Sequence, residues 1–175
     1  MNSSQRLVRS SLLLAIAIIV QGIGRSFPQI SQLLVGSIVN AVLIISTLTC
    51  GVLWGILVGG LTPLLAWIIG QLPAPMGPFI PFIMLGNIIF ILMFSLGHKR
   101  ENWIPYIFLV IAAIFKFGFL YMSANKFINL FNLGIPPKVA SKLVIMMGTP
   151  QLITALIGGF GGIILTNMLT KRKVI

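Results

Sequence analysis

The stretch 104-IPYIFLVIAAIFKFGFLYMS-123 holds one charged residue, Lys116, inside an apolar run that is long enough to cross a bilayer. No acidic residue lies within the run to neutralise the ammonium. A lysine near mid-membrane costs roughly 2.5–3.5 kcal/mol on insertion scales, so it normally faces a bundle interior or a wet cavity. In the alternative, the long side chain extends to the interface and keeps its ammonium in water. We favour the first interpretation, which makes Lys116 part of a functional site.

The composition is typical of an integral membrane protein. Hydrophobic residues make up 58% of the 175 residues and charged residues 7%, whereas soluble domains have about 25% charged residues. The length predicts a single domain, residues 1–175. Twelve basic residues oppose one acid, Glu101, and they lie mostly at the ends of apolar runs. Because no aromatic–basic pattern accompanies them, they indicate membrane topology rather than nucleic-acid binding.

Apolar runs separated by polar or proline-rich segments predict an all-α membrane protein, a bundle of six transmembrane helices. The predicted spans are residues 7–24, 34–49, 51–70, 81–96, 104–123 and 150–169. Arg6 and Arg9 precede the apolar segment LLLAIAIIV as in a signal peptide, but no clear A-x-A cleavage site follows, so the first span is predicted to be a retained helix.

The connections between these spans differ in length. Residues 25–33 and the proline-rich residues 71–79 are predicted loops, whereas the second and third spans are joined by a tight reversal within residues 47–51. Residues 124–142 form a long connection in which residues 126–134 are predicted as a short interfacial helix.

Glycines at four-residue spacing mark two helices. Gly51, Gly55 and Gly59 repeat in the third span, and Gly158 and Gly162 form a pair in the sixth. In a bilayer this spacing lets a neighbouring backbone approach closely. We therefore expect close helix packing along both faces.

The basic residues predict the orientation, since six spans place both termini on one side. Seven lie in segments on that side and four in the opposite loops, which favours cytoplasmic termini by the positive-inside rule. The seven are Arg6, Arg9, Lys99, Arg100, Lys171, Arg172 and Lys173, and the four are Arg25, Lys126, Lys138 and Lys142.

Helix rise gives each polar residue a depth. Asn40 and Asn87 lie roughly 10 Å and 9 Å below the outer ends of their spans, close to the level of Lys116. Three polar side chains on three helices therefore share one layer, where they either line a cavity or form hydrogen bonds that only hold the bundle together. Residues predicted near the rim of this layer are Gln21, Trp67, Tyr121, Asn125 and Gln151.

The sequence offers no recognisable catalytic or metal-binding constellation. Cys50 is the only cysteine, and His98, the only histidine, belongs to a hydrophilic loop. No Ser-His-Asp, HExxH, paired-carboxylate or GxxxxGK[ST] arrangement is present, so ATP would have to be used by another subunit. We expect a protein that is not an enzyme and that has no cofactor or metal.

Three segments carry a resemblance to a known family: 9-RSSLLLAIA-17, 55-GILVGGLTPLLAW-67 and 73-PAPMGPFIPFIMLGN-87. Together with six short spans, cytoplasmic termini, a very short second loop and long first and fifth outer loops, the chain resembles the S-component of energy-coupling factor (ECF) vitamin importers, the subunit that captures the substrate. The resemblance implies a multi-pass protein of a prokaryotic cell membrane. Its partners would be lipids, a micronutrient, a transmembrane T-component and two cytoplasmic ATPases, which drive release by toppling the subunit.

The resemblance also implies where ligand and T-component bind. The ligand would lie in the outer half of the bundle, under the first, third and fifth loops. In the family, two alanines four residues apart on the first helix dock on the T-component. Here Ala15 and Ala17 are two apart, and the small pair at four-residue spacing is Ser11 and Ala15.

The charge of the site predicts a ligand with a carboxylate or a similar anion, with Lys116 as its counter-charge. Arg25 in the covering loops adds positive charge, Asn40, Asn87, Asn125 and Gln151 would supply hydrogen bonds, and Trp67, Phe79 and Tyr121 apolar walls. A neutral heterocycle whose carbonyl accepts a hydrogen bond from Lys116 is the alternative.

Two other classes of protein stay open. A stand-alone channel or facilitator could assemble as a homo-oligomer through the glycine faces, but it needs a continuous polar path that the inner halves of the spans lack. The other is a structural membrane subunit without a ligand.

Overall fold

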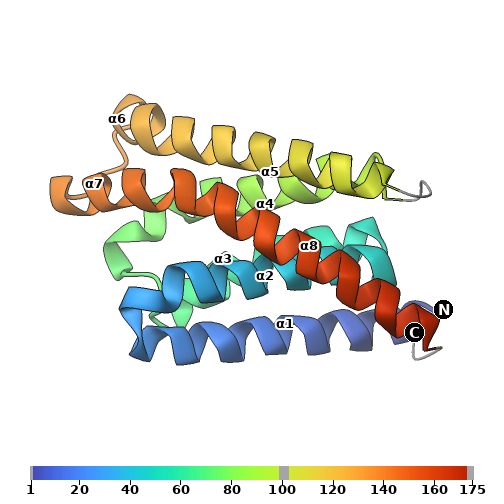
Figure 1. Ribbon diagram of the computed structural model, residues 1–175. Helices are drawn as coiled ribbons and strands as arrows, with labels where there is room; N and C mark the ends of the chain where they lie inside the picture. The colour runs from blue at the N-terminus through green and yellow to red at the C-terminus, as the bar shows by residue number, and fades with distance from the viewer. Residues whose placement is uncertain (1, 99–102, 173–175) are drawn as a thin grey trace.

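The computed structural model describes residues 2–98 and 103–172, with the backbone alone for residues 28–31. Six long helices form a bundle (Figure 1). They are α1 (Ser3–Ser26), α2 (Pro28–Cys50), α3 (Val52–Ile68), α4 (Ile80–Ser95), α5 (Ile104–Met122) and α8 (Thr149–Lys171). Shorter helical segments are the 3₁₀ helix η1 (Ala74–Phe79), the π-helical turn η2 (Ser123–Phe127), α6 (Ile128–Leu130) and α7 (Pro137–Met146).

The helices have the length and composition that a bilayer demands, since every backbone polar group inside lipid must be paired within its own helix. Five helical segments are long and apolar enough to cross a membrane: Ser3–Ser26, Gln32–Cys50, Ala74–Ser95, Ile104–Leu130 and Thr149–Lys171. The apolar α3 is shorter, with 17 residues. The predicted all-α membrane class is confirmed, whereas a sixth crossing by α3 stays a prediction.

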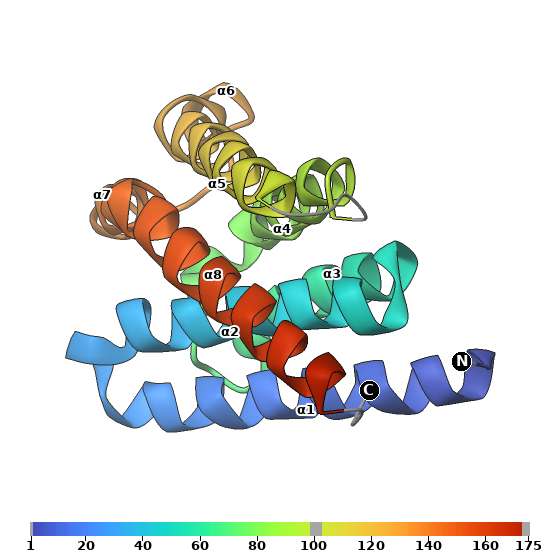
Figure 2. The same cartoon turned by 45° about the vertical axis from the view of Figure 1, so that its right-hand side comes forward.

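The start of α1 and the end of α8 lie at the same end of the bundle, which we call the terminal end (Figure 1). The short helices α6 and α7 lie at the opposite end, the loop end, and Figure 2 shows the same separation from another angle. This arrangement agrees with an even number of long helices. Which end faces the cytoplasm stays a prediction.

Two predicted connections are helical in the structure. Residues 25–33 do not form a loop, because α1 ends at Ser26 and α2 begins at Pro28, with Phe27 alone between them. Proline is favoured at the first position of a helix, where its missing N–H needs no partner, so Pro28 begins a helix here. The segment 126–134 continues α5 through η2 to Leu130 instead of forming a separate helix, and α7 is an additional one.

The glycine faces pack closely, as predicted. Gly51 takes a φ of +104° in the reversal between α2 and α3, a conformation that favours glycine. A Cβ added at Gly55 would overlap the side chain of Thr47 on α2. On α8, a Cβ at Gly158 would overlap the carbonyl oxygen of Ser37, and one at Gly162 would lie 2.9 Å from that of Ala41, so α8 and α2 approach backbone to backbone.

Two apolar clusters fill the bundle, one toward each end. The terminal-end cluster includes Leu43, Val58, Phe90, Phe94, Leu109 and Ala113. The loop-end cluster includes Ala66, Met76, Phe79, Leu120, Leu143 and Met147. Lys116 lies between Ala113 of the first cluster and Leu120 of the second along α5, and Thr62 lies between Val58 and Ala66 along α3. The polar residues therefore occupy the layer that separates the two clusters.

Candidate substrate-binding site

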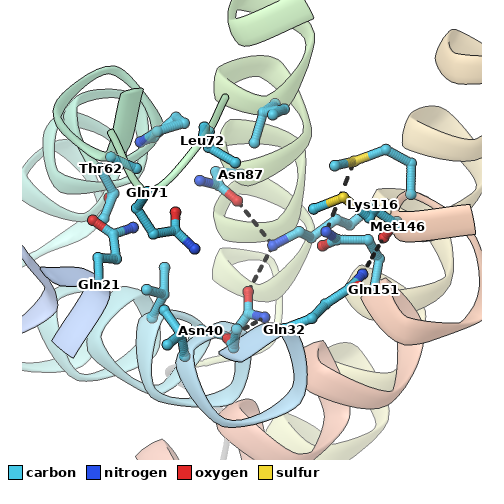
Figure 3. A pocket seen from close by; sticks show the side chains of 17 residues that line it. Gln21, Gln32, Asn40, Thr62, Gln71, Leu72, Asn87, Lys116, Met146 and Gln151 are labelled. Atoms are coloured by element: carbon cyan, nitrogen blue, oxygen red, sulfur yellow. Dashed lines mark hydrogen bonds between the residues drawn. The ribbon is translucent and has the colours of Figure 1, made fainter. Parts of the chain in front are cut away.

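The ammonium of Lys116 lies inside the bundle, with the residue only 3% exposed. Its Nζ donates hydrogen bonds to Oδ1 of Asn40 at 2.6 Å and to Oδ1 of Asn87 at 2.8 Å (Figure 3). The predicted meeting of these three side chains in one layer is confirmed. The alternative, in which Lys116 extends to the membrane interface, is wrong.

Asn87 of α4 is oriented by a backbone group of α3. Its Nδ2 donates to the carbonyl oxygen of Gly59 at 2.8 Å. In an α-helix this carbonyl would accept the N–H of the residue four positions on, but that residue is Pro63, which has no N–H. The proline leaves an acceptor free inside α3, and Asn87 occupies it. Since its nitrogen is held there, its oxygen faces Lys116.

Asn40 of α2 is oriented mainly within its own helix. Its Nδ2 donates to the carbonyl oxygen of Gly36 at 2.9 Å, one turn earlier, and makes a longer contact of 3.4 Å to Oγ1 of Thr154 on α8. The amide oxygen therefore also faces the ammonium. Two amides from different helices thus present acceptors to one lysine.

The surroundings of the ammonium are short of negative charge. An ammonium has three donors, and the two amide oxygens take two of them. The ring of Phe90 lies 5.2 Å from Nζ, within the range of a cation–π interaction. The described residues include no Asp or Glu, because the single acid of the chain is Glu101. Among them, no carboxylate balances the charge.

A cavity of about 110 Å³ opens beside Lys116. Lys116, Asn40 and Asn87 line it, as predicted for the binding layer, and so do Gln21 and Gln151, which were predicted near its rim. The cavity is therefore lined by polar side chains from distant parts of the chain, set among apolar ones.

Three polar lining residues were not predicted: Gln32, Thr62 and Gln71. Gln32 and Gln71 fall in segments interpreted as loops, and Thr62 lies within the third predicted span, directly before Pro63. The signal that could have found them is their polarity next to apolar runs, at the depth where the cavity lies.

The three aromatic residues predicted as walls lie elsewhere. Trp67 is 37% exposed, and its Nε1 donates to the carbonyl oxygen of Ala74. Phe79 is fully buried in the loop-end cluster, where it stacks on Phe82. Tyr121 is 45% exposed and stacks on Phe117. None of the three lines the cavity, whose apolar lining is aliphatic instead, with Val35, Ala66, Leu72, Ile83 and Met147 among it.

Two predicted polar ligands also lie outside the cavity lining. Asn125 is exposed and donates to the carbonyl oxygen of Tyr121 on its own helix. Arg25, also exposed, donates from its guanidinium to the carbonyl oxygen of Ile69 at 3.1 Å. Arg25 thereby links the end of α1 to the end of α3.

The predicted docking pair, Ser11 and Ala15, is exposed on α1. Its role stays a prediction. As for metals, the described residues contain no group of three or more His, Cys, Asp or Glu side chains that could hold an ion.

Fold and site together define a class: a helical membrane protein with a small cavity beside a buried ammonium. A comparison with protein families identifies the kind of membrane protein: the family described as "ECF transporter, substrate-specific component" matches residues 5–170. The chain belongs to this family. The curated proteins and the solved structures compared with the chain gave no match.

Proposed function

We propose that this ECF substrate-specific component captures a small organic molecule in the cavity beside Lys116. The observation that carries the proposal is a buried ammonium that two amides hold against a polar cavity, with no acid among the described residues. A ligand in this cavity would lie between the two apolar clusters and take the third donor of the ammonium.

The ligand carries a carboxylate or a similar anion. Coulomb attraction grows as the effective dielectric falls, so an anion gains more from Lys116 in the bundle than in water. The second candidate is a neutral heterocycle with a carbonyl acceptor. It is favoured by the two amide oxygens, which already give the ammonium polar partners without an anion.

Capture suits the structure better than conduction. The terminal-end cluster, with Phe94 and Leu109 fully buried, occupies the bundle between the cavity and the terminal end. A channel or facilitator would need polar groups along that path. The substrate would therefore enter from the loop end and would leave only after a rearrangement.

The decisive experiment removes the ammonium. Native mass spectrometry of the purified wild-type protein should detect the bound small molecule. The Lys116→Met variant should lose this molecule or bind it at least roughly tenfold more weakly, because hydrogen bonds to charged groups contribute about 1.5–3 kcal/mol. Lys142→Met is the matched control, since Lys142 is exposed on α7. Equal occupancy in the two variants would refute the assignment.

The partners would be a T-component and two cytoplasmic ATPases, with Ser11 and Ala15 in the contact and toppling as the release step. Family membership and the exposure of both residues on α1 support this part. Ala15→Leu should retain ligand and lose transport in cells that contain the complete transporter, whereas Ala15→Ser should keep both. Loss of both ligand and transport in Ala15→Leu would argue against docking.

The terminal end would face the cytoplasm of a prokaryotic cell, as the charge asymmetry supports. In a background without Cys50, a cysteine at position 138 should react with an impermeant thiol reagent added to intact cells, and one at position 171 should not. The reverse pattern would invert the orientation.

A further inference from the structure

Two carboxamides face the cavity across from Lys116. Gln21 comes from α1 and is 5% exposed, and Gln71 comes from the segment that joins α3 to η1. Figure 3 shows Lys116 directed between Asn40 and Asn87 toward Gln71, with Gln21 beyond it. The cavity thus has a cationic pole at Lys116 and an amide pole at Gln21 and Gln71.

The amide pole is unpaired within the part of the chain that the structure describes. The buried Oε1 of Gln21 has no hydrogen-bond partner there, and the partly buried Gln71 makes no side-chain hydrogen bond to the described residues. The two other glutamines that line the cavity are engaged: Gln32 donates to the carbonyl oxygen of Met146 at 2.8 Å, and Gln151 contacts Sδ of Met147. Among the described residues, Gln21 and Gln71 are therefore the two lining glutamines whose carboxamides make no hydrogen bond.

A buried carboxamide without a partner costs free energy, and an occupant that pairs with it recovers that cost. A carboxamide both donates and accepts, so an amide or a hydroxyl group satisfies it whichever way the side-chain amide is turned. An alkyl group satisfies neither atom. The amide pole thus selects for a polar group at the end of the ligand that lies away from Lys116.

We propose that the substrate is a short bipolar molecule: a carboxylic acid that binds Lys116 and carries an amide or hydroxyl group that pairs with Gln21 and Gln71. This inference rests on the proposed function, since it names the substrate class of the same cavity. The volume of about 110 Å³ suits a short chain or a single ring.

Three probes of equal heavy-atom count test the two poles separately by ligand-detected NMR titration of the purified protein in nanodiscs. Succinamate carries both a carboxylate and an amide. Succinamide replaces the carboxylate with a neutral amide, and 4-oxopentanoate replaces the amide nitrogen with a methyl group. We expect succinamate to bind most tightly, 4-oxopentanoate about threefold or more weakly, and succinamide at least roughly tenfold more weakly.

Variants test which pole of the cavity causes each difference in affinity between the probes. Gln21→Met should remove most of the preference for succinamate over 4-oxopentanoate and keep the preference for succinamate over succinamide. Lys116→Met should remove most of the preference for succinamate over succinamide and keep the preference for succinamate over 4-oxopentanoate. Gln5→Met is the matched control, because Gln5 is exposed on the same helix and should leave all three affinities unchanged.

The outcomes separate this inference from the function it rests on. Equal binding of succinamate and 4-oxopentanoate, with weaker binding of succinamide, would refute the bipolar substrate and retain the anion site. Succinamide binding as tightly as succinamate, or no binding of any probe to the wild-type protein, would count against the anion site itself.

Discussion

The two amides that hold Lys116 belong to regions built in different ways. On one side, α2 and α8 meet backbone to backbone through Gly158, and Asn40 is held mainly by its own helix. On the other side, α4 and α3 are tied by Asn87, whose nitrogen occupies the carbonyl of Gly59. The first region is organised by close packing, to which the hydrogen bond is added. In the second region the hydrogen bond itself joins the helices.

The difference shows how a proline inside a helix can serve a binding site. Pro63 removes one N–H from α3, and the acceptor it frees orients Asn87 toward the ammonium. Gly36 is different, because its carbonyl also lies in position to accept the backbone N–H of Asn40. Loss of Asn40 therefore leaves that carbonyl paired, whereas loss of Asn87 leaves the carbonyl of Gly59 with no donor from its own helix.

The largest effect should come from Gly158→Leu, which breaks the packed region. The new Cβ would overlap the carbonyl oxygen of Ser37 and lie 2.9 Å from the backbone nitrogen of Ala41, and neither backbone atom can yield. Overpacking typically costs about 1–3 kcal/mol, and we expect the upper end of that range as a lower melting temperature in detergent. Gly161→Leu is the control, since nothing lies within 4 Å of a Cβ there. Equal melting temperatures would show that α8 can move away from α2.

The second prediction compares the two amides directly. Asn40→Leu and Asn87→Leu each remove one hydrogen bond from Lys116, which should cost about 1.5 kcal/mol, the lower end of the range for charged groups, because the ammonium keeps its other amide partner. Asn87→Leu should destabilise the protein by about 1 kcal/mol more, because it also leaves the carbonyl of Gly59 unpaired. Thermal unfolding of the two variants side by side measures the difference. A larger loss of stability in Asn40→Leu than in Asn87→Leu would contradict this explanation.

A smaller change in stability tests the role of Pro63. Adding Pro63→Ala to Asn87→Leu supplies a backbone N–H for Gly59 and should recover about 1 kcal/mol of the lost stability. In the wild-type background, the same N–H competes with Asn87, so Pro63→Ala should weaken ligand binding instead. Melting temperatures of the single and double variants test this coupling. Additive effects would mean that Pro63 and Asn87 act independently.

The smallest effect should come from Thr154→Val. The contact between Asn40 and the Thr154 hydroxyl is long, at 3.4 Å, and Asn40 keeps its bond to Gly36 without it. We expect a change below about 0.5 kcal/mol in stability and no change in ligand affinity. A loss above about 1 kcal/mol would show that Asn40 depends on α8 as Asn87 depends on α3, and the contrast between the regions would disappear.

Depth was the part of the site that the sequence could predict. Position along a helix determines distance from its end, so Asn40, Asn87 and Lys116 were placed in one layer before any contact was known. The family resemblance was confirmed over residues 5–170. The glycine spacing likewise predicted where backbones meet, because four-residue spacing defines a face without reference to a partner.

Rotation about the helix axis was the part that the sequence could not predict. Spans that are apolar on nearly every side give little information about which face points inward. Trp67 and Tyr121 therefore lie near the expected depth but outside the cavity. The prediction of a loop at residues 25–33 failed for another reason. Pro28 begins α2 instead of interrupting the chain, so Gln32 lies on a helix, where it lines the cavity.

The order of the partners along the chain has a consequence for biogenesis. Asn40 and Asn87 are translated before Lys116, and the later of the two precedes it by 29 residues. At roughly 5–20 residues per second, both amides leave the ribosome more than a second before the lysine does. When α5 enters the bilayer, its acceptors are already present in the preceding helices, which offsets the insertion penalty of the ammonium. A circular permutant that begins at α5 would have to insert that charge before either acceptor exists.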